Sequence, residues 1–191
     1  SHAHYLAKGG DLKCFFAELY GKESGCTKGI GGSMHLVDLS VGFYGAVPIV
    51  GSTIPIIVGT AFGRNLQNKA GVSVCFFGEG ATEEGVFHES IQFAALHKLP
   101  VLFVCENNLY SVYSPLSVRQ AENRNICSIV EGHGIPTQTG NGNDLDDVIE
   151  KSTTAVEHCR SGNGPYFLEF STYRWLEHCG PHYDNDIGYR T

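Results

Sequence analysis

Two short polar clusters follow apolar runs near the middle of the chain, and their residue types suit metal and phosphate chemistry. A Gly-Glu-Gly motif at 78–80 follows the apolar run 72–77, and Glu-Asn-Asn at 106–108 follows the run 101–105. A carboxylate, an amide oxygen and a loop carbonyl make half of an octahedral oxygen shell, and Mg²⁺ commonly leaves its other places to water and phosphate. Glycines let a phosphate approach the backbone, and a following helix presents free amides. The two clusters together predict a diphosphate and metal site.

Each cluster also has a purely structural interpretation. A Gly-Glu-Gly turn can be a turn with a helix-capping acid, and a pair of asparagines suits a left-handed turn. Glu83 and Glu84 favour a helix start through the helix dipole and would repel a phosphate, which favours a metal ion as mediator. What favours the site is the pair of clusters, at this spacing, on predicted neighbouring strand ends.

The elements around the clusters predict how they come together. Short apolar runs predict strands at 72–77 and 101–105, and apolar residues at helical spacing predict a helix at 84–99 that Pro100 closes. A strand, a helix and a strand with short joints give a parallel pair with a right-handed crossover. Ligands of open parallel sheets bind beyond the carboxyl ends of the strands, where both clusters lie.

The rest of the chain completes an α/β pattern. Asp11 is a candidate cap for a short helix that ends at Gly21, the segment 51–67 predicts a helix with Pro55 in its first turn, and 143–160 predicts another. A weak strand pattern lies at 135–139, and a stronger one lies at 166–171. We expect a three-layer α/β/α fold with a mainly parallel sheet, as one domain over residues 1–191.

Composition excludes several classes of protein. The chain has 191 residues and a formal net charge of −7, which argues against a nucleic-acid surface. The longest apolar stretch, 45–62, contains two prolines and predicts buried core rather than a membrane helix. The seven cysteines are odd in number and form no CxxC motif, which predicts reduced thiols in the cytoplasm or, in a eukaryote, an organelle matrix.

Beyond the two clusters, four segments of the chain are distinctive: GCTKGIGGSMHL, AALHKLPVLFVCENNLY, CRSGNGPYFLEF and TYRW. Together with the clusters, they resemble the alpha subunit of the thiamine-diphosphate-dependent 2-oxo-acid dehydrogenases, a family with pyruvate, branched-chain and acetoin enzymes. A GDG motif followed further along the chain by NN is the family's cofactor-binding signature, and the likeness runs through almost the whole chain. The resemblance implies the thiamine-diphosphate-binding fold.

The resemblance implies roles for residues of the two clusters. Glu79 stands where the family has an aspartate ligand to Mg²⁺, and Asn108 resembles the side-chain ligand from the second cluster. The carbonyl of Tyr110 would be the third protein oxygen. Gly80 and Ala81 would contact the diphosphate through their backbone.

The resemblance also implies roles outside the clusters. Val50 matches a position that touches the aminopyrimidine ring, and the glycine-rich loop 28–35 would lie near the cofactor. His178 matches an active-site histidine near the diphosphate and the reacting centre, where it is a candidate acid/base. Ser117 and Arg119 lie in a segment that resembles one at the family's active-site mouth.

The implied chemistry begins with proton removal from the thiazolium ring. The resulting ylid attacks a 2-oxo acid, and decarboxylation follows with the cofactor as electron sink. In the family a beta subunit supplies the cofactor-activating glutamate, two alpha and two beta chains assemble, and a lipoyl acyltransferase accepts the product. We therefore expect a 2-oxo-acid or acetoin-type dehydrogenase alpha component that uses thiamine diphosphate and Mg²⁺. Alone, this chain should be inactive.

Three departures from the family pattern leave two alternatives open. Glu79 replaces the usual aspartate and adds roughly 1.5 Å of reach. Leu176 stands where pyruvate-type members often carry a histidine. The family's alpha chains extend beyond both ends of this one, and their Tyr-Arg pair of the cofactor pocket would precede Ser1, so we expect a chain truncated at both ends. The alternatives are a transketolase-like or carboligating biosynthetic enzyme with the same cofactor, and a noncatalytic binding or assembly subunit.

Overall fold

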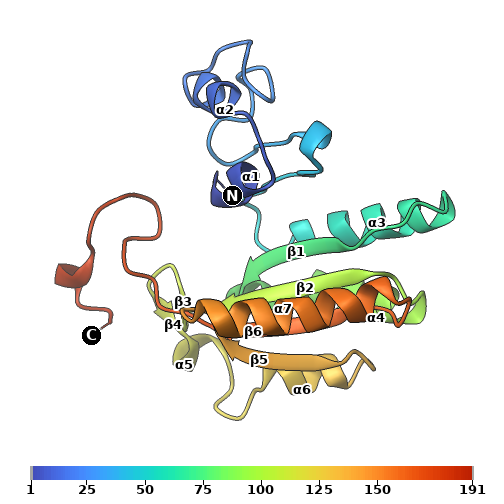
Figure 1. Cartoon of the computed structure of the whole chain (residues 1–191). Helices are drawn as coiled ribbons and strands as arrows, with labels where there is room; N and C mark the ends of the chain where they lie inside the picture. The colour runs from blue at the N-terminus through green and yellow to red at the C-terminus, as the bar shows by residue number, and fades with distance from the viewer. Residues whose placement is uncertain (1, 191) are drawn as a thin grey trace. The chain divides into compact units, whose positions relative to one another are not determined.

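The computed structural model describes residues 2–190, which divide between Thr53 and Ile54 into two compact units. Figure 1 labels the helices and strands of both units. That the whole chain forms one domain stays a prediction, and each unit is described here by itself.

The first unit is built from short helices around a small aromatic core. Its helices are α1 (His2–Ala7), α2 (Leu12–Leu19) and the 3₁₀ turn η1 (Leu39–Val41). Asp11 accepts a hydrogen bond from the amide of Cys14 over 2.7 Å, which confirms the predicted N-cap. Tyr5, Phe15 and Leu36 form the buried cluster of this unit.

The second unit contains a four-stranded parallel sheet in the order β1-β2-β6-β5. Its strands are β1 (Ser73–Gly78), β2 (Val101–Asn107), β5 (Thr137–Asn141) and β6 (Tyr166–Ser171). The predicted parallel pairing of the first two strands is confirmed. A small antiparallel ribbon of β3 (Tyr110–Ser111) and β4 (Ser114–Pro115) follows β2.

Helices cover both faces of this sheet, so the predicted three-layer α/β/α fold is confirmed. α3 (Thr53–Leu66), α4 (Gly85–Leu96) and α6 (Ile126–Glu131) contribute to the core on one face, and α7 (Leu145–Arg160) packs on the other. The 3₁₀ turn η2 (Glu79–Glu83) joins β1 to α4. The short helix α5 (Leu116–Arg119) follows β4, and the turn η3 (Asn185–Ile187) lies near the end of the chain.

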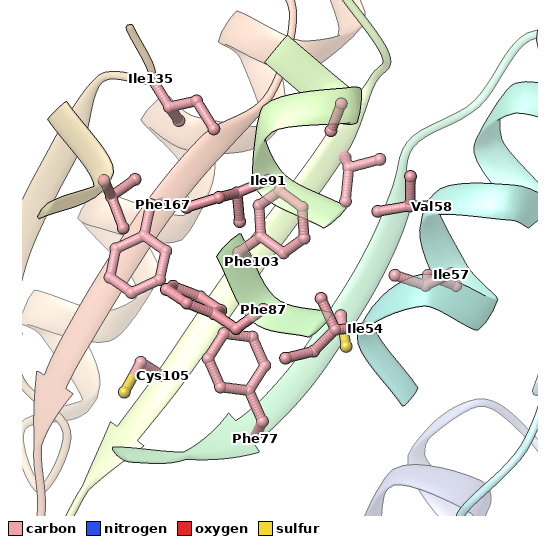
Figure 2. Close-up of a cluster of buried hydrophobic side chains, with 14 of the residues drawn as sticks. Ile54, Ile57, Val58, Phe77, Phe87, Ile91, Phe103, Cys105, Ile135 and Phe167 are labelled. Carbon is pink, nitrogen blue, oxygen red and sulfur yellow. The ribbon is translucent and has the colours of Figure 1, made fainter. Parts of the chain in front are cut away.

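Alternation along β2 divides the core between the two faces. Phe103 and Cys105 belong to the cluster with α4, whereas Leu102 and Val104 belong to the cluster with α7, because successive side chains of a strand point to opposite faces. Figure 2 shows Phe103 near Ile91 of α4 within the first cluster. A helix-strand core of this kind holds the ends of β1 and β2 in fixed register.

Shortening Ile91 to valine should lower the free energy of unfolding by about 1 kcal/mol, because the methyl group lost leaves a small cavity in a close-packed core. Ile91 is fully buried, whereas Ile56 on α3 is 48% exposed and provides a matched control. Urea denaturation of Ile91→Val and Ile56→Val measures the difference. Equal stabilities of the two variants would contradict the core position of Ile91.

Some predicted boundaries and one predicted burial were wrong. The apolar stretch 45–62 is buried mainly from Ile54 onward, and Ile49 is 69% exposed, because the residues before Ile54 do not belong to the hydrophobic cluster that begins there. The predicted helix 84–99 ends at Leu96, with His97 as its C-cap, and the strand predicted from Ile135 begins at Thr137.

Within residues 2–190, no helix is long and apolar enough to cross a membrane.

Candidate metal and diphosphate site

The register of the sheet brings the two polar clusters to the same edge. Gly78 pairs with Glu106 across β1 and β2, so the turns that follow these residues leave the sheet side by side. η2 begins at once with Glu79, whose side chain is 1% exposed. The carboxylate predicted as a metal ligand is therefore buried at the carboxyl end of the sheet.

An arginine from the segment after β4 reaches this carboxylate. Arg119 donates from Nη2 to Oε1 of Glu79 over 2.6 Å and also forms an ion pair with Glu83. Gln120 donates to the same carboxylate of Glu83 over 2.6 Å. The negative charge that Glu83 was expected to place beside a phosphate is thus offset in part by Arg119, which it shares with Glu79.

The second cluster forms a turn fixed by side-chain hydrogen bonds. The amide of Asn107 donates to Oε1 of Glu169 over 2.8 Å, while its oxygen accepts from the backbone of Leu109 over 3.0 Å. The oxygen of Asn108 accepts from the backbone of Tyr110, also over 3.0 Å. Left-handed backbone occurs at Leu109, with φ of 70°, rather than at either asparagine. The asparagines therefore shape the turn with their side chains.

The backbone predicted to meet the diphosphate is closely packed. A Cβ placed on Gly80 would lie 3.2 Å from Oγ of Ser111 and 3.4 Å from Nη1 of Arg119. Ala81 is buried, and its carbonyl accepts from the backbone of Glu84 over 3.4 Å. A glycine at position 80 is accounted for by this tight contact between η2 and the segment after β2.

His178 lies on the segment that follows β6, and this segment reaches the β3–β4 ribbon. Arg174 donates to the carbonyl of Val112 over 2.8 Å and to the hydroxyl of Tyr189 over 2.6 Å. His178 itself is exposed, and its Nδ1 lies 3.5 Å from Nη1 of Arg174. Leu176, two residues earlier, is 37% exposed. The structure therefore carries His178 toward the ribbon next to the asparagine turn.

Val50 is the one predicted site residue that belongs to the first unit. Its side chain is 57% exposed. Its role beside an aminopyrimidine ring stays a prediction, as do the ligand roles of Glu79, Asn108 and Tyr110.

The glycine-rich loop of the first unit is organised by a buried carboxylate. Oε2 of Glu18 accepts from the amides of Thr27 and Gly29 over 2.8 and 2.9 Å, and Oε1 accepts from Gly31 and Gly32 over 2.8 and 2.9 Å. Gly25 packs so closely on α2 that an added Cβ would lie 2.6 Å from Cα of Glu18. Four amides held by one carboxylate make this loop an ordered structure.

The thiols near the site are not set up as nucleophiles. Burial raises the pKa of Cys105 well above its ordinary value, and the neighbouring carboxylate of Glu169 raises it further. Burial also raises the pKa of Cys127 to about 12, and its thiol donates to Oε2 of Glu169 over 3.3 Å. Both groups stay protonated at neutral pH, and the thiolate is the reactive form.

Sequence reasoning missed the positions of three charged residues. Glu169 lies two residues after the buried Phe167 and on the same face of the strand, and Glu18 lies three residues after Phe15 on the apolar side of α2. A charge on an apolar strand or helix face is a signal of a buried partner, and it was present in both cases. For Arg119, the sequence predicted only a position in a segment like the one at the family's active-site mouth. No local pattern indicated its contact with Glu79.

The donor set of the site suits a hard cation that arrives with its own ligand. Glu79 provides a carboxylate, Asn108 an amide oxygen and Tyr110 a carbonyl, and Mg²⁺ prefers such oxygens while retaining places for water and phosphate. In residues 2–190 there is no group of three or more His, Cys, Asp or Glu side chains that could hold a metal. The predicted donor set consists of oxygens alone, which is the chemistry that Mg²⁺ requires, and its ligand roles stay a prediction.

A cavity elsewhere in the second unit has a different character. Its volume is about 310 Å³, and most of its lining is apolar. It lies on the α7 face of the sheet, between strands and helix, and is lined in part by Val74, Val104, Val148 and Phe170. None of the predicted ligand residues lines it, so it is not the predicted diphosphate site.

Comparison with proteins of known sequence supports the resemblance. Over 177 residues, 93% of this chain, it is 41% identical to the alpha subunit of acetoin:2,6-dichlorophenolindophenol oxidoreductase of Bacillus subtilis (strain 168), covering 53% of that protein. It is 40% identical over the same length to the pyruvate dehydrogenase E1 component subunit alpha of Rhizobium meliloti (strain 1021), covering 51% of it. The chain thus spans about half the length of these relatives.

Comparison with solved structures supports the fold. A transketolase from Campylobacter jejuni superposes with a TM-score of 0.61 over 86% of this chain and 26% of the transketolase chain, at 20% sequence identity. The sequence model of the family described as "Dehydrogenase E1 component" matches residues 1–191. On these matches, the chain belongs to the dehydrogenase E1 component family.

Proposed function

We propose that this chain is the cofactor-binding part of an alpha component that decarboxylates a 2-oxo acid or cleaves an acetoin-type ketone with thiamine diphosphate and Mg²⁺. The observation that carries the proposal is the register of Gly78 with Glu106, which sets the Gly-Glu-Gly turn beside the asparagine turn. Relatives named for acetoin and pyruvate support the substrate class.

Under this proposal, the residues of the two turns bind the diphosphate end of the cofactor and its metal ion. Glu79, Asn108 and the Tyr110 carbonyl would hold Mg²⁺, and the backbone of Gly80 and Ala81 would contact the diphosphate. When bound, thiamine diphosphate supplies a carbanion nucleophile and an electron sink for decarboxylation. What supports these roles is the oxygen donor set at one edge of a parallel sheet.

His178 would hold and move a proton beside the reacting centre, on a segment that Arg174 fastens to the β3–β4 ribbon. Val50, of the first unit, would contact the aminopyrimidine ring. A histidine suits proton transfer because its ordinary pKa lies near neutrality. Both roles rest on the family resemblance and belong to this proposal.

The proposal includes partners. A beta subunit would provide the cofactor-activating glutamate in an assembly of two alpha and two beta chains, and a lipoyl acyltransferase would accept the product. The support for a beta chain is that the relatives are named as alpha subunits. The proposed compartment is the cytoplasm, or an organelle matrix in a eukaryote.

Titration calorimetry on the full-length protein with its beta chain tests the proposal. We expect thiamine diphosphate to bind when Mg²⁺ is present and to lose affinity when EDTA removes the ion, because the diphosphate would be held chiefly through the metal. Thiamine without the diphosphate is the control ligand and should bind weakly or not at all. Absence of any magnesium-dependent binding would overturn the proposal and favour a noncatalytic assembly subunit.

A carboligating enzyme with the same cofactor is a second candidate, and Leu176 favours it. An apolar side chain stands two residues before His178, where pyruvate-type members often carry a histidine. Incubation of the assembled enzyme with a 2-oxo acid and a lipoyl acceptor separates the two. An acylated lipoyl group supports the dehydrogenase, and a carbon-carbon ligation product with a lipoyl group left unmodified supports the carboligase.

A further inference from the structure

The ion pairs of η2 suggest why a glutamate can serve at position 79. The guanidinium of Arg119 engages Oε1 of Glu79 and also pairs with Glu83, and its Nη1 would lie 3.4 Å from a Cβ placed on Gly80. The side chain of Arg119 is only 13% exposed, and that of Glu79 is 1% exposed. One cation thus lies against the acid, the glycine and the second acid of the turn that would receive the diphosphate.

We infer that Arg119 is a positioning residue that holds Oε1 of Glu79, so that Oε2 is presented to the divalent cation. This inference rests on the proposed function. Mg²⁺ binds a carboxylate through one oxygen in a strict octahedral geometry. A glutamate has one more rotatable bond than an aspartate, and the bond to Arg119 restricts that freedom.

Charge favours the same role. The diphosphate would bring more negative charge than the ion brings positive charge, so the complex of the two carries a net negative charge at neutral pH. Glu79 and Glu83 alone would repel this complex, and the single positive charge of Arg119, which pairs with both carboxylates, halves their net negative charge. Removing Arg119 therefore frees the side chain of Glu79 and leaves the carboxylates of Glu79 and Glu83 facing the negatively charged complex of metal and diphosphate.

The other arginine bound to η2 provides a matched control. Arg124 donates to Oγ1 of Thr82 over 3.1 Å and to the carbonyl of Thr82 over 2.6 Å. It fastens the same turn from the same segment of the chain but contacts neither carboxylate through these bonds. A purely structural role of the arginines predicts similar effects of both substitutions on metal binding.

The test measures Mn²⁺ binding by electron paramagnetic resonance, with thiamine diphosphate present, in the full-length protein and its beta chain. Arg119→Met should weaken Mn²⁺ binding about 10- to 100-fold, as loss of an outer ligand partner does. Arg119→Lys should recover part of the affinity. Arg124→Met should retain wild-type affinity even if its melting temperature falls.

A double-mutant cycle with Glu79→Asp sharpens the test. The shorter aspartate cannot reach Arg119 and the ion together, so adding Arg119→Met to Glu79→Asp should change Mn²⁺ affinity by no more than about twofold. An equal loss in both backgrounds, or tighter Mn²⁺ binding by Arg119→Met, would overturn the positioning role while leaving the proposed function intact. A wild-type protein that binds no Mn²⁺ with thiamine diphosphate would overturn both.

Discussion

Replacing Glu18 with glutamine is expected to lower the free energy of unfolding of the first unit by about 3–5 kcal/mol, because a buried carboxylate that accepts four part-buried hydrogen bonds is lost. Glu18 is fully buried, and its two oxygens accept the amides of Thr27, Gly29, Gly31 and Gly32. Glutamine fits the space, but its NH₂ group cannot accept the two amides that it would face. Urea denaturation of the full-length protein measures the loss.

Two further measurements make the Glu18 prediction specific. Glu23→Gln, at an exposed position in the same region, should leave stability within about 0.5 kcal/mol of the wild type. Amide hydrogen exchange at Gly29 and Gly31 should become faster in Glu18→Gln, because these amides lose their acceptor. Unchanged exchange at these glycines would show that the carboxylate does not hold the loop.

The same carboxylate gives the first unit a defined pH dependence. Burial raises the pKa of Glu18, but hydrogen bonds from Thr27, Gly29 and Gly32 outweigh it and lower the pKa from 4.5 to about 2. Between these values the unfolded chain binds the proton and the folded chain does not, so this stabilisation is full above about pH 4.5 and is lost as the pH falls toward 2. The stability difference between wild type and Glu18→Gln should shrink across that window.

Asn108→Ala is expected to weaken magnesium-dependent binding of thiamine diphosphate by at least about 100-fold, the upper end of the effect of losing an outer ligand partner. The substitution would remove a direct oxygen ligand of an ion that tolerates little geometric error. It would also remove the hydrogen bond that Oδ1 of Asn108 accepts from the backbone amide of Tyr110, whose carbonyl is the third proposed ligand. Calorimetry of the full-length protein with its beta chain, at fixed Mg²⁺ concentration, measures the change.

The neighbouring asparagine is the matched control. Asn107 bonds Glu169 and the backbone of Leu109, so its substitution by alanine disturbs the turn without removing a proposed ligand. We expect Asn107→Ala to lower affinity less than Asn108→Ala does. Unchanged affinity in Asn108→Ala would show that this residue is not a metal ligand. A larger loss of affinity in Asn107→Ala than in Asn108→Ala would show that Asn107 is the ligand instead.

Local patterns were sufficient for much of the fold and for the outline of the site. The crossover from β1 through α4 to β2 follows from short joints and helical spacing, and this pairing set the two clusters at one edge. The place of β6 between β2 and β5 was not predictable in the same way. It depends on pairing between strands far apart in the chain, which leaves no periodic signal in either strand.

The supporting residues of the site escaped prediction for the same reason. Arg119 meets Glu79 across 40 residues of chain, and Glu169 meets Asn107 across 62. A candidate ligand residue can be recognised in the sequence because a motif surrounds it. The residue that hydrogen-bonds to it lies far away in the chain and can be identified only in the folded structure. For that reason the sequence identified the candidate ligands and not the groups that orient them.

The central position of β6 has a consequence for how the chain is made. β2 leaves the ribosome long before β6, and until β6 arrives its inner edge has no parallel neighbour on that side. The asparagine turn likewise lacks the carboxylate of Glu169 until β6 is synthesised. Because long-range strand pairing is slow, the nascent protein must keep an apolar strand edge unpaired while α7 is still being translated. The contact between the asparagine turn and Glu169 therefore forms only after β6 has been synthesised, and a ribosome stalled before Tyr166 would expose a chain prone to pair with others.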